Sequence, residues 1–527
     1  MFQGDRIWMG VGDVHVDLLL NQANRHGLIA GASGTGKTVT LKVMAEGFSK
    51  AGVPVFMADV KGDVTGMAQA GEDSDNIKKR VEKFGLEGFT LEGCPCRFWD
   101  MLGGQGIPVR ITVSDMGPTL LSRLLGLTEA QEGVLNIIFR IADDKQMLLI
   151  DLKDLRAMLN YASEHAKEYE TVYGKVSSQS VGAILRELIA IEDQGGDVFF
   201  GEPALDLSDW FQCAPNGQGY VNILNAAKLI QSPQIYAMFL LWMLSELFDT
   251  LPEAGDLDKP KFVFFFDEAH LLFNNMPGEL LDKIIQVVKL IRSKGVGVYF
   301  ITQSPSDIPD EVLAQLSNRI QHGLRAYTPA EQKAVRAAAS SFRANPKFKS
   351  EDVILELGTG EALVSFLNEE GQPCVVENAK ILPPQCLMAA ASQECMDKAL
   401  ADQASLMEKY GTAVDRESAF EIISGEAQKE AEEEKLEEER AALEAEKAEL
   451  EKQKAEAEAK AAKEAEKAAA KAQKEAEKEA ERAAKAAEKQ KQELFKDVTK
   501  AATSILGQIG RDASKQIMRG LFGTRKR

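Results

Sequence analysis

The sequence lacks an apolar run long enough to cross a lipid bilayer. Its most apolar stretch, Tyr236 to Phe248, is interrupted by Ser245 and Glu246, whereas a membrane-spanning helix needs about 20 mainly apolar residues. The N-terminus also has no basic stretch followed by an apolar core, which is the pattern of a secretory signal. We therefore expect a cytoplasmic protein without a transmembrane segment.

Cysteine is scarce, with six residues in a chain of 527. Only Cys94 and Cys96 lie close together, and no second pair follows at the spacing of a zinc site. The sequence therefore predicts ordinary reduced thiols rather than a disulfide framework or a zinc site.

The chain also lacks an excess of positive charge, since 62 Lys and Arg face 81 Asp and Glu for a net charge of −19. A protein that coats nucleic acid through electrostatics needs the opposite balance. This excludes that class of protein but leaves room for a few basic loops that line a channel.

Residues 1–390 alternate strand-length apolar runs with longer helical patterns, which predicts an α/β fold with a mainly parallel sheet. We expect the sheet domain in two parts, residues 1–117 and 216–390, around a mostly helical insertion at 118–215. A hairpin formed by 361–367 and 374–377 would close it. The expected strands are Gly27–Ala30, Val53–Asp59, Val109–Val113, Tyr220–Leu224, Lys261–Phe266 and Gly297–Thr302.

After a helical linker at 391–426, proline and glycine are absent from residues 427–492, where Ala, Glu and Lys dominate. High helix propensity and Glu–Lys pairs three and four apart predict a long helix over 427–494. Leu436, Leu443 and Leu450 are seven apart, which allows a weak or partner-dependent coiled coil. A single charged helix explains this region equally well.

Residues 495–527 mix apolar with basic side chains, and eight basic against two acidic residues give this segment a net charge of +6. Such a basic amphipathic segment can bind a partner protein, an anionic membrane surface or its own globular body. We favour binding to protein.

The clearest motif is a glycine-rich loop between an apolar strand and a helical pattern, the context in which a P-loop forms. Its backbone N–H groups and the helix N-terminus would face phosphate oxygens. Lys37 would reach the β- and γ-phosphates, and Thr38 would hold Mg²⁺. The motif predicts binding of ATP and Mg²⁺ by the residues Gly31, Ala32, Ser33, Gly34, Thr35, Gly36, Lys37 and Thr38.

Hydrolysis also needs carboxylates, and the buried run that ends at Phe266 leads directly into Asp267 and Glu268. Asp267 suits the magnesium shell, and Glu268 suits polarisation of the attacking water. The strand Gly297–Thr302 ends in Gln303. If it lies beside the Asp267 strand, Gln303 points to the γ-phosphate and senses it or orients water.

Four arginines are candidates for contact with the nucleotide. Arg292 could stabilise transition-state charge in a neighbouring subunit, Arg25 could approach the nucleotide of its own subunit, and Arg319 and Arg325 are rivals of Arg292. Each of them can also be an ordinary surface arginine. The segment Asp59-Val60-Lys61-Gly62-Asp63 either faces the ligand crevice at the strand ends or caps a loop.

Together these motifs resemble the HerA–FtsK superfamily of ring-forming ATPases, and among them the stand-alone bacterial HerA-like ATPases of the YjgR type. The resemblance covers residues 1–390 and the basic C-terminal segment. It rests on the P-loop with the preceding Arg25–Ala30, Asp59–Asp63, Asp267–His270 and Ile301–Pro305.

This resemblance implies a RecA-like core, a homohexameric ring, DNA in the central pore and Arg292 as the arginine finger acting in trans. Archaeal HerA proteins carry a β-barrel before the ATPase, for which the 30 residues ahead of Gly31 leave no room. Partner binding through such a barrel is thus in doubt, and the long helix is a hypothetical replacement.

Three functions remain open at this stage. The first is a DNA translocase or helicase, whose DNA contacts would be local and include Lys61 or Lys294. The second is a motor that acts on protein, as in secretion or conjugation. The third is an ATP-controlled assembly scaffold in which the long helix has the main role.

Overall fold

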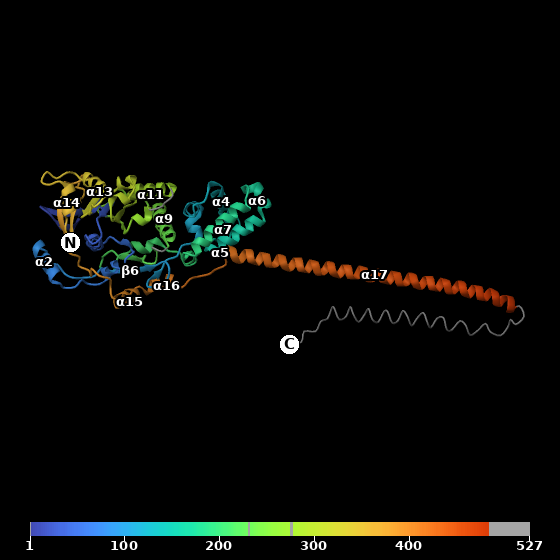
Figure 1. The fold of residues 1–527 in the computed structure, drawn as a ribbon. Helices are drawn as coiled ribbons and strands as arrows, with labels where there is room; N and C mark the ends of the chain where they lie inside the picture. The colour runs from blue at the N-terminus through green and yellow to red at the C-terminus, as the bar shows by residue number, and fades with distance from the viewer. Residues whose placement is uncertain (1, 230–231, 274–277, 484–527) are drawn as a thin grey trace. The chain divides into compact units, whose positions relative to one another are not determined.

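The computed structural model describes residues 2–229, 232–273 and 278–483. The chain divides into two units, Met1–Ala427 and Gln428–Arg527. Figure 1 shows the first unit as a layered α/β body. The basic segment predicted at 495–527 lies outside the described residues.

One sheet of 13 strands organises the first unit. Its order is β1-β2-β13-β12-β11-β4-β10-β9-β5-β8-β6-β7, with β3 paired to β2. The strands from β11 to β7 run parallel, whereas β12, β13, β2, β3 and β1 join antiparallel. This confirms the mainly parallel α/β class and the RecA-like core. The strands are β1 Phe2–Gln3, β2 Arg6–Val11, β3 His15–Leu19, β4 Gly27–Ala30, β5 Val55–Asp59, β6 Cys96–Asp100, β7 Ile107–Pro108, β8 Val221–Asn225, β9 Phe262–Phe266, β10 Val296–Thr302, β11 Asn318–His322, β12 Glu361–Ser365 and β13 Glu377–Ile381.

Five of the six expected strands are present, and the expected strand Val109–Val113 is wrong. Ile111 makes only an isolated bridge to Phe200, and Thr112 caps a helix that begins at Val113. Because the capping box satisfies the first N–H groups of that helix, the chain turns away from the sheet there. The expected hairpin is present as β12 and β13, but its second strand begins at Glu377 and runs to Ile381, later in the chain than the expected 374–377.

The central strands are buried on both faces, as in a parallel sheet covered by helices. In β9, Phe262, Phe264 and Phe266 belong to one apolar core, whereas Val263 and Phe265 belong to another. This alternation follows from the two-residue period of a strand. The helices of this part are α1 Lys37–Lys50, α2 Asp75–Phe84, α9 Pro233–Thr250, α10 His270–Phe273, α11 Gly278–Ile291, α12 Asp310–Leu313, α13 Pro329–Ser340 and α14 Ser350–Glu356.

Helices dominate residues 113–199, where the sequence predicts a helical insertion. Their buried apolar residues belong to the same core as α9, and Figure 1 shows α4, α5, α6 and α7 grouped together. The domain boundaries expected within the first unit stay predictions. The helices are α3 Val113–Leu124, α4 Glu129–Asp144, α5 Leu152–Glu164, α6 Ala166–Tyr173, α7 Ser178–Glu192 and α8 Gly196–Phe199.

A strap of chain after β13 connects the core to the root of the long helix. Helices α15 Gln393–Ala401 and α16 Ala404–Tyr410 lie along it, and α17 Ala419–Ala483 follows. The root is fixed within the first unit, because the Ser418 hydroxyl donates to the buried Asp154 carboxylate at 2.5 Å. Lys153 also pairs with Glu421 at 3.1 Å.

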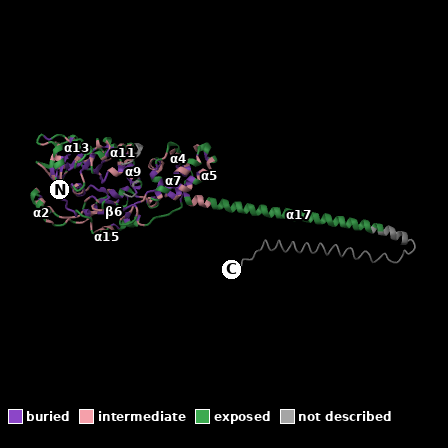
Figure 2. Ribbon diagram, viewed as in Figure 1, coloured by how far each residue is buried: buried purple, intermediate pink, exposed green. Residues whose placement is uncertain are grey.

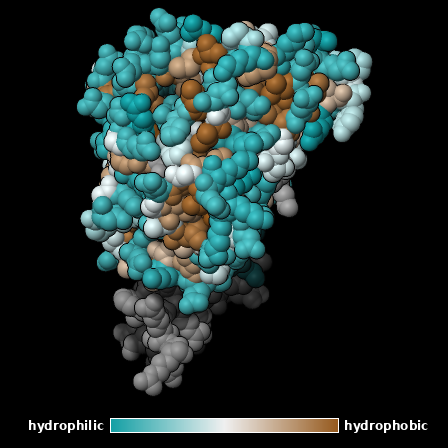
Figure 3. Space-filling model, turned by 90° about the vertical axis from the view of Figure 1, so that its left-hand side faces the viewer, coloured by the Kyte–Doolittle hydropathy of each residue, from teal (hydrophilic) through white to brown (hydrophobic). Residues whose placement is uncertain are grey.

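The long helix is exposed along most of its described length (Figure 2). Leu436, Leu443 and Leu450 are between 39% and 54% exposed, so the coiled coil stays a prediction. In the described part of the chain, none of the helices has the length and apolar character needed to span a membrane. The cysteines are free thiols. Figure 3 shows one face of the body, on which small apolar areas are separated by polar side chains.

Candidate active site

The P-loop lies between β4 and α1, at the carboxyl end of the parallel strands. Close packing explains its glycines: a Cβ on Gly31 would lie 2.5 Å from the Cβ of His322. Gly36, which precedes α1, has a φ of 114°, a conformation that favours glycine. The Gly31 N–H also donates to the Thr302 carbonyl at 3.2 Å, which fixes the loop beside the end of β10.

Lys37 is 7% exposed, and its ammonium group lies inside the loop. It donates to the carbonyls of Gly31 at 2.6 Å and Ala32 at 3.1 Å. Burial, and then the nearby charge of Lys61, lower the pKa of Lys37. An anionic phosphate at this position would therefore stabilise the ammonium strongly.

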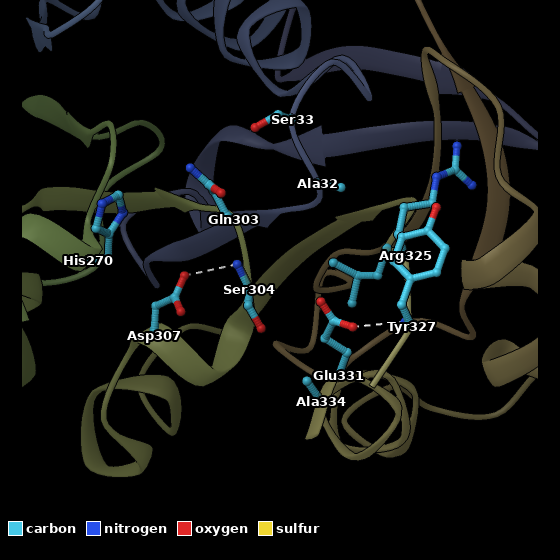
Figure 4. A pocket seen from close by; sticks show the side chains of 11 residues that line it. Ala32, Ser33, His270, Gln303, Ser304, Asp307, Arg325, Tyr327, Glu331 and Ala334 are labelled. Atoms are coloured by element: carbon cyan, nitrogen blue, oxygen red, sulfur yellow. Dashed lines mark hydrogen bonds between the residues drawn. The ribbon is translucent and has the colours of Figure 1, made fainter. Parts of the chain in front are cut away.

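Two cavities flank the loop. One of about 300 Å³ is lined by Ser33, Gly34, Gly36, Lys37, Thr38, Val39, Lys42, Lys61, Asp63, Asp267, Thr359 and Met388. The other, of about 430 Å³, is lined by Ala32, Ser33, His270, Gln303, Ser304, Asp307, Leu324, Arg325, Tyr327, Glu331 and Ala334 (Figure 4). Both contain Ser33 at the tip of the P-loop, so the loop separates them.

The first cavity offers a site that fits Mg²⁺. Thr38 and Asp267 both line it, and hydroxyl and carboxylate oxygens are the ligands that Mg²⁺ prefers. Asp63 lines it as well, and its Oδ1 is buried without a hydrogen-bond partner among the described residues. Burial is the main reason that the pKa of Asp267 is raised to about 6. The nearby charge of Lys61 lowers this pKa, and the charge of Glu268 raises it. A bound Mg²⁺ would favour the charged carboxylate and neutralise phosphate charge.

Glu268 follows Asp267 in a backbone conformation that is rare outside glycine, with a φ of 49°. Its carboxylate is 6% exposed and is held from three sides. Lys61 Nζ lies 2.5 Å from Oε1, His270 Nδ1 3.2 Å from Oε2, and the Gln303 amide 3.5 Å from Oε2. Burial alone would raise the pKa of Glu268, but Lys61, His270 and Gln303 hold it below its usual value. Glu268 is therefore a charged, buried carboxylate in a strained turn, as is typical of functional sites.

Gln303 directly follows β10, which lies between β4 and β9. This order places the amide between the P-loop and Glu268, and Figure 4 shows Gln303 on the side of the cavity that faces Ser33. The structure thus brings together residues from three separate parts of the sequence: Lys37 and Thr38, Asp267 and Glu268, and Gln303. This arrangement can bind a triphosphate and activate water beside it.

The family described as Helicase HerA-like C-terminal matches residues 6–527. The chain belongs to this family of P-loop ATPases.

Solved structures that resemble this HerA-like chain share little sequence with it. The bacterial conjugative coupling protein TrwBdeltaN70 is 15% identical, with 71% of this chain and 90% of that chain covered and a TM-score of 0.47. TrwB in complex with ADP and Mg²⁺ is 15% identical, with 71% and 88% covered and a TM-score of 0.45. VirB4 of Thermoanaerobacter pseudethanolicus is 15% identical, with 75% and 99% covered and a TM-score of 0.44. No curated protein matches the chain.

Arg25 does not reach the nucleotide site of its own HerA-like subunit, which corrects the expectation from the sequence. It precedes β4, whereas the P-loop follows β4, so a strand of roughly 13 Å separates them. Its guanidinium packs against Gly371, in the turn after β12. Arg25 and the P-loop are close in the sequence because β4 has only four residues, but this strand places them at opposite ends of the sheet.

Arg292 lies at the same end of the sheet as Arg25, after α11, and is exposed. The side-chain amide of Asn24, the residue before Arg25, donates to the Arg292 carbonyl at 3.4 Å, so the two segments lie side by side. Arg319 donates to the carbonyls of Leu313 and Leu316, both at 2.9 Å, and has a structural role. Arg325 is the arginine that lines the cavity beside Ser33.

The Asp59–Asp63 segment both caps a loop and faces the site, so the two interpretations of its sequence each describe part of it. The Asp59 carboxylate accepts N–H groups from Gly62 at 2.6 Å, Val64 at 3.0 Å and Thr65 at 3.1 Å, which caps the loop. Lys61, at the outer side of this loop, pairs with Glu268. Sequence reasoning missed this pair and the contact of His270 with Glu268, although both residues lie in the motifs that carry the family resemblance.

Proposed function

We propose that this HerA-like protein is a Mg²⁺-dependent ATP-hydrolysing ring motor. The observation that carries the proposal is the convergence of Lys37, Asp267, Glu268 and Gln303 on the P-loop. Family membership supports an ATPase, and the geometry supports the roles of the individual residues.

In this proposal, Lys37 and the loop N–H groups hold the β- and γ-phosphates, and Thr38 and Asp267 hold Mg²⁺. Glu268 and Gln303 orient a water molecule. Its oxygen attacks the γ-phosphorus, the bond from that phosphorus to the bridging oxygen breaks, and ADP leaves. Glu268 accepts the proton of the water. The charged state and buried position of Glu268 suit this role.

The homohexameric ring is proposed on the family resemblance, with Arg292 as its arginine finger in trans. Arg292 lies beside Asn24, at the opposite end of β4 from its own P-loop, so it can act as a finger only toward a neighbouring subunit. Arg325, which lines the cavity at Ser33, is the rival that would act within one subunit. Measuring ATP turnover in a mixture of the Arg292→Ala and Glu268→Gln variants separates these roles.

The polymer that the ring moves is proposed to be DNA, on the family resemblance. A protein substrate is the alternative, and the charge distribution favours it. Both lysines considered for DNA contact are paired, Lys61 with Glu268 at 2.5 Å and Lys294 with Glu253 at 3.2 Å, and the chain carries a net charge of −19. In either case the exposed α17 is the proposed contact region for a protein partner.

An ATPase assay with and without duplex DNA tests the choice between these substrates. Strong stimulation by DNA, weakened by salt, supports a DNA translocase or helicase. A ring that hydrolyses ATP at the same rate with and without DNA supports a motor that acts on protein. If α17 alone also controls assembly of the ring, the result supports a scaffold. Cell fractionation tests the proposed cytoplasmic location.

A further inference from the structure

One contact in the site has no role in the proposed reaction: the ion pair between Lys61 and Glu268. Lys61 Nζ lies 2.5 Å from Glu268 Oε1. Glu268 is the residue proposed to activate water, so a cation bound to its carboxylate competes with that water for the same oxygen. The pair therefore bears directly on when the site can act.

Lys61 also faces the phosphates. It lines the same cavity as Lys37, Thr38 and Asp267. Two ammonium groups that converge on one cavity repel each other, and a multiply charged anion between them removes that repulsion. The space between these two ammonium groups therefore favours a ligand with several negative charges.

In the loop around Lys61, hydrogen bonds fix the backbone, whereas the Lys61 side chain can move. The Asp59 carboxylate holds the N–H groups of Gly62, Val64 and Thr65, so the backbone position is set. The Lys61 side chain is 48% exposed, whereas that of Glu268 is 6% exposed and fixed in a strained turn. A change of partner is therefore made by Lys61 and not by Glu268.

We infer that Lys61 is a phosphate-sensing residue that exchanges between Glu268 and the terminal phosphate of ATP. This rests on the proposed ATPase function. When the γ-phosphate is present, the Lys61 ammonium moves to its oxygens and leaves the Glu268 carboxylate to accept the proton of water. When ADP occupies the site, Lys61 returns to Glu268. Lys61 is thus a positioning residue that distinguishes ATP from ADP.

The test compares nucleotide binding with turnover in the full chain. Dissociation constants for ADP and for the slowly hydrolysed analogue ATPγS are measured by competition with a fluorescent nucleotide, together with kcat and KM. A charge-assisted contact to the γ-phosphate predicts that Lys61→Ala lowers the preference for ATPγS over ADP by about tenfold. ADP affinity changes less than about twofold on the same argument, and kcat falls.

Two variants control this experiment. Lys61→Arg keeps the charge and is expected to restore most of the preference for ATPγS. Lys79→Ala removes an exposed lysine of α2 that lies outside the cavity and is expected to change nothing. Thermal unfolding of each variant shows that a lost preference does not come from a misfolded chain.

Two results would overturn the inference. In one, Lys61→Ala changes ADP and ATPγS affinity in parallel, or changes neither. In the other, it keeps the preference and loses only stimulation by DNA, which would make Lys61 a DNA contact. Both are distinct from failure of the ATPase proposal itself, which is judged on Lys37→Ala.

Discussion

The Gln303 amide lies 3.5 Å from Glu268 Oε2, although 35 residues separate the two in the sequence. Parallel pairing of β9 with β10 in register, with Phe266 opposite Phe300, brings the two strand ends together. Because the P-loop strand β4 pairs with the other edge of β10, the amide can contact both the carboxylate and a γ-phosphate. We therefore expect different effects on turnover when the carboxylate and the amide are replaced.

Glu268→Gln should retain nucleotide binding and lose turnover. The amide keeps the size of the side chain but cannot accept a proton, so kcat should fall by about 10²- to 10⁴-fold. ATPγS affinity and kcat are the quantities to measure. Gln303→Ala should lower kcat by less, because it removes an orienting contact and leaves the base. A Glu268→Gln protein with normal kcat would remove Glu268 from the reaction.

Arg292→Ala should reduce ATP turnover by about 10³-fold if its guanidinium stabilises transition-state charge in the next subunit. A mixture with Glu268→Gln protein is the sharper experiment. One variant keeps the base and the other keeps the arginine, so some interfaces of a mixed ring are complete.

The mixture should therefore hydrolyse ATP faster than the average of the two variants measured alone. A rate equal to that average contradicts action in trans. Arg325→Ala in place of Arg292→Ala is the matched control, because Arg325 lines the cavity of its own subunit.

Lys42→Met should loosen the strap that passes behind the P-loop helix. Lys42 is fully buried and donates to the carbonyls of Asp63, Leu387 and Met388 at 2.7, 2.8 and 3.0 Å. Loss of these charged hydrogen bonds should lower the free energy of unfolding by roughly 3 kcal/mol. Urea unfolding and limited proteolysis within residues 383–392 measure the effect. Lys79→Met, on an exposed face of α2, should change neither.

His26 predicts a loss of stability in acid. Its Nε2 lies 2.7 Å from the Val288 carbonyl, and its Nδ1 accepts the Val298 N–H at 3.0 Å, so the ring is neutral. Burial lowers the pKa of His26 from 6.5 to about 4. Between about pH 4 and pH 6.5, His26 therefore binds a proton in the unfolded chain but not in the folded chain.

Stability should accordingly decrease as the pH falls from about 6.5 to about 4, by up to roughly 3 kcal/mol for this group. Urea unfolding across this range should show a shallower pH dependence for His26→Gln, even though that variant is less stable at neutral pH. An unchanged slope would mean that His26 is protonated in the folded state. His322 is also buried with its pKa lowered to about 4, and it should supply part of the remaining slope.

The sequence predicts the centre of this fold well because its central strands are buried on both faces. The runs that lead into Gly31 and Asp267 are apolar throughout, and the run that leads into Gln303 is apolar up to Thr302, as expected of parallel strands that are covered on both faces. It predicts the edges less well. The strand β6 contains Arg97 and Asp100, and its identity depends on pairing with β8, which no local pattern reveals.

For the site, the sequence predicts which residue types take part but not which side chains meet. Lys37, Asp267 and Glu268 follow from motifs with a fixed geometry. The prediction for Arg25 is wrong because the four-residue strand β4 places this arginine at the other end of the sheet from the P-loop. The pairing of Lys61 with Glu268 depends on where β5 lies relative to β9, and this is a property of the folded sheet.

The most direct test of the central claim is ATP turnover by the purified full chain with Mg²⁺, compared with the Lys37→Ala variant. Lys37 is the buried cation that the P-loop holds in position for the phosphates. The account predicts Mg²⁺-dependent release of phosphate by the unaltered chain and loss of that release in Lys37→Ala, with the fold retained. Retained turnover in a folded Lys37→Ala protein would contradict it.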